Sequence, residues 1–199
     1  MKRSEINAAV KWADELLKKN NIRLPLYAYW DMETWKAHRT ELDTVKRVML
    51  GWDITDFGTG DFSTVGAVLY TVRNGDMNDA NVGVPYCEKY IVMKEGQRLP
   101  KHYHVFKTED IINRAGGVLT VYLWNADPAT GEQLDTDVHV FMDGIECVFK
   151  AGEEILVYPG NSISLKPHIA HIFGPKPGMG DLVVGEVSKV NDDNTDNYF

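Results

Sequence analysis

Two histidines and a glutamate between Gly96 and Gly116, in the segment GQRLPKHYHVFKTEDIINRAG, constrain this chain more than any other feature. His102 and His104 are two residues apart, and residues two apart on a β-strand point to the same face. Their imidazoles can therefore bind one ion, and Glu109 follows far enough along for the chain to return a carboxylate to them. Such ligands suit manganese, iron, zinc, cobalt or nickel, whereas calcium and magnesium require oxygens. A fourth ligand is expected from elsewhere.

The size and charge of the chain exclude several classes of protein. Its 199 residues can bury a substantial core without disulfides or a structural metal, so we expect a bound metal to serve chemistry. The formal net charge of −8 and the lack of a basic run argue against a nucleic-acid partner. The chain has neither an apolar run near the roughly 20 residues of a membrane span nor the apolar core of a signal peptide. With two cysteines and no disulfide framework, we expect a cytoplasmic protein.

The first fifty residues have helical patterning. From residue 4 to about residue 19, apolar side chains recur three and four apart, which predicts an amphipathic helix. A less regular apolar stripe predicts a second helix from about residue 33 to residue 49, ended by Gly51-Trp52.

From residue 51 onward, short β-prone runs alternate with Gly, Asn, Asp and Pro, which is typical of a barrel or sandwich. Asn74-Gly75, Glu95-Gly96 and Asp143-Gly144 predict hairpins or strand breaks. The predicted strands are residues 65–73, 86–94, 98–106, 117–124, 139–142, 145–150, 154–157, 162–166, 170–173 and 181–189.

The spacing of glycines, histidines and glutamate from Gly96 to Gly116 resembles the first motif of the cupin superfamily without a gap. Pro159-Gly160 and His171 resemble the second cupin motif, which supplies the last histidine from a facing strand; His168 competes for that role. The resemblance implies a mainly β fold, a cupin β-barrel of the jelly-roll type with an N-terminal α-helical segment. It also implies one metal site, formed by His102, His104, Glu109 and His171.

Nearly the whole chain is similar to one cupin family, the D-lyxose isomerases. The strings that carry the likeness are MKRS with Ile6-Asn7, Leu24-Pro25, the region from Trp30 to Trp35, GWDITDFG at 51–58, TVRNG at 71–75, YCEK at 86–89, HYHVFKTEDIINRAGG at 102–117, PGNSISL at 159–165 and GEVSKVNDDNTDN at 185–197. Two positions depart from the family pattern: Tyr198 stands where a basic residue is expected, and His168 where a glycine is usual.

The likeness implies a metal-dependent aldose–ketose isomerase that interconverts D-lyxose and D-xylulose, with D-mannose and D-fructose as a second pair. Proton transfer through an enediol, Mn2+ as the divalent ion and a homodimer are further implications. We expect a single domain over residues 1–199, in which helices of residues 1–50 pack on a barrel of residues 51–199.

Glu186 and Lys107 are the candidate catalytic residues. Glu186 lies in a β-prone run in the same parity as Val184 and Ser188, so it can face the barrel interior as a general base or face solvent instead. Lys107 shares parity with Glu109 and can hold negative charge near the sugar oxygens, or it can be a surface lysine at a strand end.

Candidate sugar contacts are Lys89 in YCEK, Asp193 in the acidic final motif and, by stacking, Trp35 or Trp124. Lys89 can instead pair with an acid on the barrel rim, and the tryptophans can be core residues. Glu109 is expected to be a ligand, with the role of base as its alternative.

Two other functions use the same ligands. Cupin dioxygenases hold a metal in this way, and oxygen uptake would identify one. A non-catalytic sugar-binding cupin would retain its function after replacement of Glu186 by Gln, whereas an isomerase would lose most of its turnover and keep its metal.

Overall fold

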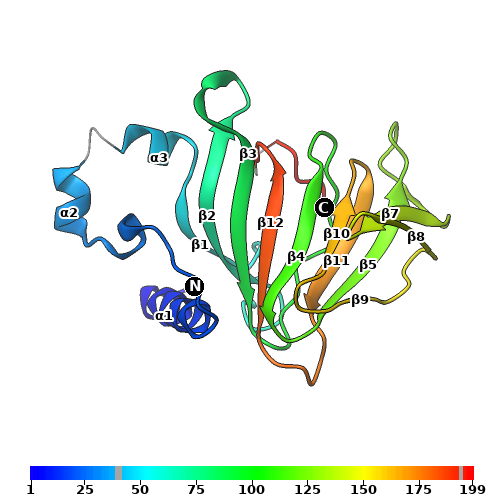
Figure 1. Ribbon diagram of the computed structural model, residues 1–199, viewed down its shortest axis with the longest axis horizontal. Coiled ribbons are helices and arrows are strands. Elements are labelled where there is room, and N and C mark those ends of the chain that lie inside the picture. The colour runs from blue at the N-terminus through cyan, green and yellow to red at the C-terminus, as the bar shows by residue number, and fades with distance from the viewer. Residues whose placement is uncertain (39–41, 193–194) are drawn as a thin grey trace.

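The computed structural model describes residues 1–38, 42–192 and 195–199 (Figure 1). Among these residues, helices lie in the amino-terminal part: α1 (Arg3–Lys19), a 3-10 turn (Leu26–Tyr29), α2 (Met32–Ala37) and α3 (Asp43–Arg47). The strands follow from Gly51 onward and form two antiparallel sheets joined by turns and loops. The predicted mainly β, jelly-roll architecture with an N-terminal helical segment is confirmed.

The larger sheet has the strand order β1-β2-β3-β12-β4-β10-β7-β8. Strands distant in sequence are neighbours in its centre, where β12 lies between β3 and β4 (Figure 1). The bounds are β1 (Gly51–Thr55), β2 (Ala67–Asp76), β3 (Asp79–Met93), β4 (Glu109–Gly116), β7 (Val138–Met142), β8 (Ile145–Phe149), β10 (Ser162–Leu165) and β12 (Leu182–Lys189).

The smaller sheet is formed by β5 (Leu119–Ala126), β6 (Gln133–Leu134), β9 (Ile155–Val157) and β11 (Ile169–Pro175). Its strands β5 and β11 pair along seven residues, from Leu119↔Pro175 to Asn125↔Ile169. Buried side chains from both sheets form one core, to which β4 contributes Ile111, β5 contributes Leu123 and β12 contributes Leu182.

Helix α1 covers part of the outer face of the larger sheet (Figure 1). Ala9, Ala13 and Leu17 recur every four residues, so they form one stripe on the helix. That stripe packs in a second core cluster with Tyr70 of β2 and Val183 of β12, among others. The predicted helix over residues 4–19 is therefore confirmed, and packing of its apolar face explains its stability.

The prediction of one helix over residues 33–49 is wrong where the structure describes that segment. Helix α2 ends at Ala37 and α3 begins at Asp43; residues 39–41, within the predicted helix, lie outside the described residues. Asp31 caps α2 by accepting a hydrogen bond from the Thr34 backbone N–H at 2.8 Å. Gly51-Trp52, expected only to end the helix, begins β1, which pairs with β2.

Two β predictions also need correction. Residues 98–106 contain no extended strand in the part of the chain described: Pro100 has no N–H for a ladder, and this segment makes isolated bridges such as His102↔His171. Asn74-Gly75 is not a turn, because β2 continues to Asp76. Asp143-Gly144 does join β7 to β8, as predicted.

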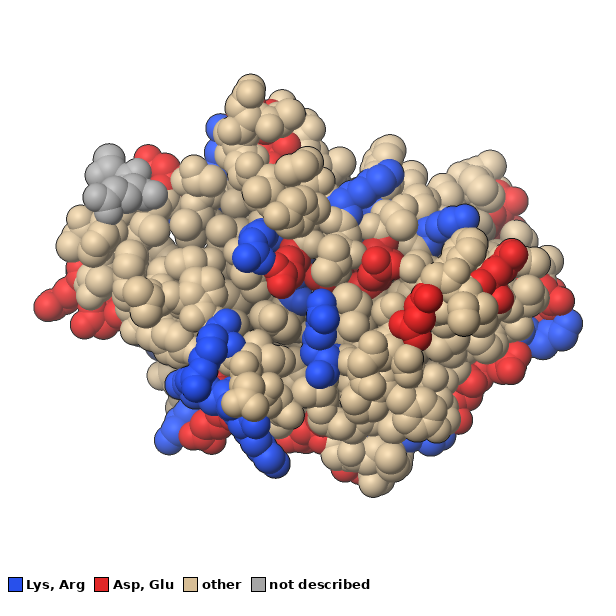
Figure 2. Space-filling view, viewed as in Figure 1, with Lys and Arg blue, Asp and Glu red and all other residues tan. Residues whose placement is uncertain are grey.

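The exterior offers no large region of one charge on the face shown in Figure 2, where acidic and basic side chains are interspersed. Within the described ranges, no helix is both long and apolar enough to cross a membrane. The division into helices of residues 1–50 and a barrel of residues 51–199 within one domain stays a prediction.

Candidate active site

The structure brings three histidines together although the third is distant in sequence. His102 and His171 of β11 form an antiparallel bridge, with His171 N donating to His102 O at 2.9 Å and His102 N to His171 O at 3.2 Å. Their ring centroids are 4.2 Å apart. One ligand atom from each of His102, His104 and His171 lies within 4.8 Å of the others.

Backbone carbonyls fix the orientation of all three rings. A carbonyl oxygen can only accept, so each Nδ1 carries a proton, which leaves Nε2 as the ring nitrogen that can bind a metal. Metal-binding histidines are typically held by such a hydrogen bond on the other ring nitrogen. The pairs are His102 with Pro100 O at 2.9 Å, His104 with Asp196 O at 2.5 Å, and His171 with Ile169 O at 3.0 Å.

Glu109 lies beside two of these histidines. As the first residue of β4, it places Oε1 3.3 Å from His171 Nε2 and 3.6 Å from His104 Nε2. Within the described part of the chain, these three atoms are buried and have no hydrogen-bond partner. Buried polar atoms without partners are costly, and a cation bound between the two Nε2 atoms and the carboxylate oxygen would remove that cost. His102, His104, His171 and Glu109 therefore fit a divalent metal ion.

A second charged group lies beside the first. The Lys107 Nζ is 2.9 Å from Glu109 Oε2, 3.0 Å from Glu186 Oε1 and 3.2 Å from Asn191 Oδ1. Glu186 lies on β12, with the Lys89 Nζ 3.9 Å from its Oε1. All three ionic side chains of this second group, Lys89, Lys107 and Glu186, are buried. Lys107 thus connects the candidate metal ligand Glu109 to the candidate base.

The charges of the site follow from burial and from these neighbours. Burial lowers the pKa of His102 well below its ordinary value and also lowers the pKa of His171, so both imidazoles are neutral at pH 7. Burial acts to raise the pKa of Glu109, but the Lys107 ammonium and His104 hold it well below its usual range. Neutral imidazoles and an ionised carboxylate are the protonation states that metal binding requires.

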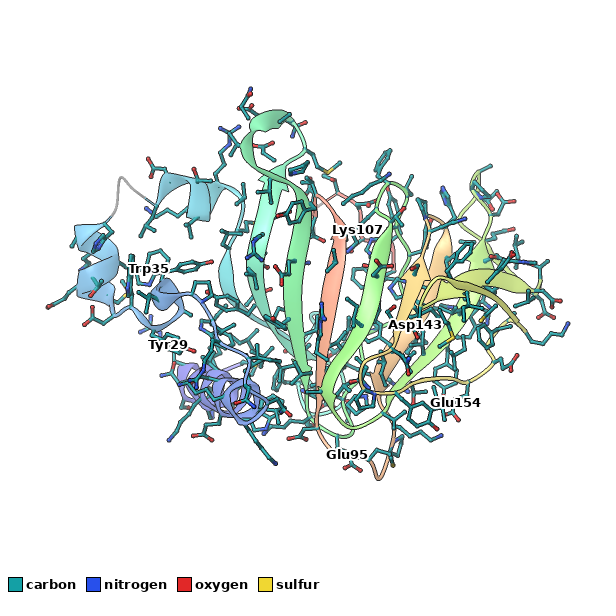
Figure 3. The ribbon with its side chains drawn as sticks, in the orientation of Figure 1. Tyr29, Trp35, Glu95, Lys107, Asp143 and Glu154 are labelled. Atoms are coloured by element: carbon teal, nitrogen blue, oxygen red, sulfur yellow. The ribbon has the colours of Figure 1, made fainter. Side chains whose placement is uncertain are left out.

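The histidines, Glu109 and Glu186 line one cavity, and apolar side chains complete its wall. Lys107 enters it from the loop before β4 and is labelled in Figure 3. A cavity with an apolar wall and a few converging polar groups is typical of a small-molecule site. The apolar lining comes from Phe57, Leu69, Ile91, Leu99, Ile111 and Phe173.

Other predicted site residues are placed differently. Trp35 lies in α2, packed on Tyr27 and Trp30, and Figure 3 shows it on the far side of β1 and β2 from Lys107. Trp124 lines a separate groove on the smaller sheet. Asp193 lies outside the described residues. Lys89 does line the cavity.

His168 is not part of the histidine cluster. Its φ of +64° places it in the left-handed region, which explains why a glycine is favoured at this position. Its backbone N–H donates to His104 O at 2.8 Å. His171, not His168, is thus the histidine that the fold brings to His102 and His104.

Residues that our sequence analysis missed come mainly from the final segment. Asp196 accepts hydrogen bonds from the backbone near Lys107, and Asn197 lines the cavity. No local spacing relates Asp196 to His104, since 92 residues separate them. Only long-range contacts reveal their proximity.

The fold and site define a jelly roll of two antiparallel sheets with a candidate metal centre of three histidines and one glutamate. The chain matches the D-lyxose isomerase family over residues 1–199. It is 40% identical over 200 residues to the D-lyxose/D-mannose isomerase of Escherichia coli O157:H7, covering 100% of this chain and 88% of that protein. The enzyme of the same name from Serratia proteamaculans is also 40% identical, with 100% and 87% covered. The chain belongs to the D-lyxose isomerase family and is a sugar isomerase.

Solved structures support the fold. The L-ribose isomerase of Acinetobacter sp. DL28, solved with L-ribose, superposes with a TM-score of 0.65 at 16% identity, covering 100% of this chain and 92% of that one. The L-ribose isomerase of Cellulomonas parahominis gives a TM-score of 0.59, also at 16% identity, with the same coverage of both chains.

Proposed function

We propose that this chain interconverts D-lyxose with D-xylulose and D-mannose with D-fructose, using one divalent ion and a proton transfer through an enediol. The observation that carries the proposal is the convergence of the unpartnered atoms of His104, His171 and Glu109 beside the Lys107–Glu186 pair. We name these sugars because the chain belongs to the D-lyxose isomerase family and its relatives are D-lyxose/D-mannose isomerases. Manganese as the ion, a homodimer and a cytoplasmic location belong to the same proposal. The family resemblance alone supports the first two, and the two cysteines without a disulfide framework support the location.

His102, His104, Glu109 and His171 would hold the ion. When bound, it supplies a Lewis acid that polarises oxygens of the open-chain sugar. The protein contributes orientation, because each ring is fixed by its Nδ1 hydrogen bond and Glu109 by Lys107. This arrangement supports Glu109 as a metal ligand and not as the general base, since its Oε1 faces His104 and His171.

Glu186 is the proposed base. Its carboxylate takes the proton from the second carbon of the open-chain aldose, beside the carbonyl, and returns it to the first carbon. The hydroxyl proton of the second carbon moves to the oxygen of the first, so the ketose has the same composition as the aldose. A well-placed base of this kind supplies about 10²–10⁴ in rate.

Lys107 and Lys89 are the proposed charge-stabilising groups. Lys107 lies between Glu109 and Glu186, where its ammonium can offset negative charge that develops on sugar oxygens. Lys89 lines the same cavity, with its Nζ 3.9 Å from Glu186 Oε1. Trp35 remains a proposed sugar contact from the sequence, although it is not among the residues that line the cavity. Asp193, which lies outside the described residues, also remains a proposed contact.

The test is proton exchange during turnover. Metal-stripped protein is reloaded with Mn2+ and converts D-lyxose in deuterated water, and deuterium is expected at the carbon beside the carbonyl. Conversion without any exchange would instead leave a hydride shift, or a base fully shielded from solvent, as the account.

Replacement of the base sharpens this test. We expect Glu186→Gln to lose turnover by about 10²–10⁴ while retaining the ion, because the amide cannot take the proton. The matched control is Glu88→Gln, which alters a carboxylate of β3 that pairs with Arg73 outside the cavity. Equal turnover of the two variants would remove Glu186 from the mechanism.

A further inference from the structure

We propose that Asp196 is a positioning residue that orients both the candidate ligand His104 and Lys107. Its carboxylate holds the loop between His104 and Glu109, and its backbone carbonyl holds the His104 ring. The inference deepens the proposed function, since the groups that it orients belong to the proposed metal site and catalytic pair.

The loop before β4 has no strand partner for its own amides. Three consecutive backbone N–H groups point instead at the carboxylate of Asp196: Val105 N and Phe106 N donate to Oδ1 at 2.8 and 3.0 Å, and Lys107 N donates to Oδ2 at 2.9 Å. Successive N–H groups form a concave anion site of this kind. Asp196 is only 4% exposed, so these charge-assisted hydrogen bonds are shielded from water.

The backbone of Asp196 is held at both sides. Its own N–H donates to Asp192 O at 3.1 Å, and two residues later Tyr198 and Tyr103 exchange backbone hydrogen bonds of 3.0 and 3.1 Å. From this fixed position, Asp196 O accepts from His104 Nδ1 at 2.5 Å. The residue therefore determines which His104 nitrogen faces Glu109.

The carboxylate of Asp196 holds the loop that carries Lys107, and its backbone carbonyl holds the His104 ring. Both of these side chains approach Glu109 in the cavity. His104 Nε2 lies 3.6 Å from Glu109 Oε1, while the Lys107 ammonium lies 2.9 Å from Glu109 Oε2. A shift of the loop held by Asp196 would move both relative to Glu109. Loss of such a supporting contact typically costs 10–100-fold in metal affinity.

The test is Mn2+ binding by metal-stripped protein, measured by titration calorimetry on Asp196→Asn. The amide retains one oxygen and loses the charge, and we expect the Kd to rise about 10–100-fold. The matched control is Asp192→Asn, an equal change of charge four residues away, whose carboxylate contacts Thr195 Oγ1 at 2.7 Å. Equal Kd values for the two variants, both folded by circular dichroism, would overturn the inference.

A second measurement, amide hydrogen exchange, needs no metal, and its wild-type result is informative even without a stable variant. In the wild-type protein, amides of residues 105–107 should exchange with deuterated water as slowly as those of β4, and at least about tenfold faster in Asp196→Asn. Rapid exchange in the wild type would overturn the inference even if Asp196→Asn fails to fold. Failure of wild-type protein to bind Mn2+ would instead contradict the proposed function, and exchange alone would then decide the role of Asp196.

Discussion

At the scale of single residues, Lys107 balances the negative charges of Glu109 and Glu186. Burial acts to lower its pKa, but Glu109 and Glu186 raise the pKa above its ordinary value, so the ammonium stays charged. The same ammonium donates to both carboxylates, at 2.9 and 3.0 Å. Its positive charge allows two carboxylates to be buried side by side.

Replacement of Lys107 should therefore lower the stability of the fold as well as the rate of the reaction. Lys107→Met leaves Glu109 and Glu186 without their shared cation, and we expect the metal-stripped protein to lose about 3–5 kcal/mol of unfolding free energy. Urea unfolding measures this loss. The control is Lys176→Met, which removes an exposed ion pair with Glu154 and should cost far less unfolding free energy. Similar losses in the two variants would contradict the electrostatic account.

Replacement of His168 by glycine, in contrast to replacement of Lys107, should hardly change the stability of the fold. A non-glycine residue in the left-handed region costs about 1–2 kcal/mol, and glycine relieves that cost while losing more entropy on folding. We expect His168→Gly to change the free energy of unfolding by less than about 1 kcal/mol, and His168→Val to lower it clearly. Thermal unfolding of both variants checks this. A large loss in His168→Gly would show that the imidazole itself is needed.

Among elements, those with a strong local pattern were predictable and those defined by distant partners were not. Helix α1 has its own apolar stripe, and β12 is an unbroken run of mostly apolar residues. Strand β1 exists because it pairs with β2, and the chain around His102 is held by β11 through a bridge. Such pairings leave no signal in the short segment itself.

The β2–β3 hairpin shows how a close approach overrides turn propensity. Asn-Gly favours a two-residue turn, yet Gly75 lies within β2, opposite Gly83 of β3. A Cβ on Gly75 would stand 2.1 Å from Val84 O. The glycine is required for close packing of two backbones, not for a turn.

Gly75→Ala should consequently disrupt the hairpin. The added methyl group cannot be accommodated without moving the backbone of β3, so we expect a loss of at least about 2 kcal/mol in unfolding free energy. Urea unfolding again gives the value. Asn78→Ala, at an exposed position of the same hairpin, should change it by less than about 0.5 kcal/mol. Tolerance of Gly75→Ala would contradict the close approach of the two strands.

For the whole molecule, the site imposes a pH dependence on the stability of the metal-stripped protein. His102 and His171 titrate near pH 6.5 when unfolded, and burial lowers the pKa of each when folded. Below pH 6.5, the unfolded chain binds protons that the folded chain does not, so the free energy of unfolding falls as pH falls. Above pH 6.5, the two groups contribute no slope.

Each histidine can contribute up to about 1.4 kcal/mol per pH unit below pH 6.5. Urea midpoints at pH 7.5, 6.5 and 5.5 measure the effect. The double variant His102→Asn with His171→Asn should lose most of this slope, which separates it from the titration of other groups. Equal wild-type midpoints at pH 7.5 and 5.5 would contradict neutral burial of these imidazoles.

The candidate site as a whole was predictable where ligands follow a short spacing and where the chain resembles its family. His102, His104 and Glu109 are close in sequence, and His171 followed from the second motif. The supports of the site were not predictable, because Asp196 meets His104 and Lys107 only after β12 has returned the chain to the cavity. Long-range packing determines these contacts.

The most direct measurement is a titration of the metal-stripped protein with Mn2+ while turnover of D-lyxose to D-xylulose is followed. If the four candidate ligands bind one ion, we predict negligible turnover without the ion and a rise to a plateau at about one ion per chain. Full turnover in the stripped protein, or a plateau that requires a different number of ions, would contradict a single catalytic centre at His102, His104, Glu109 and His171.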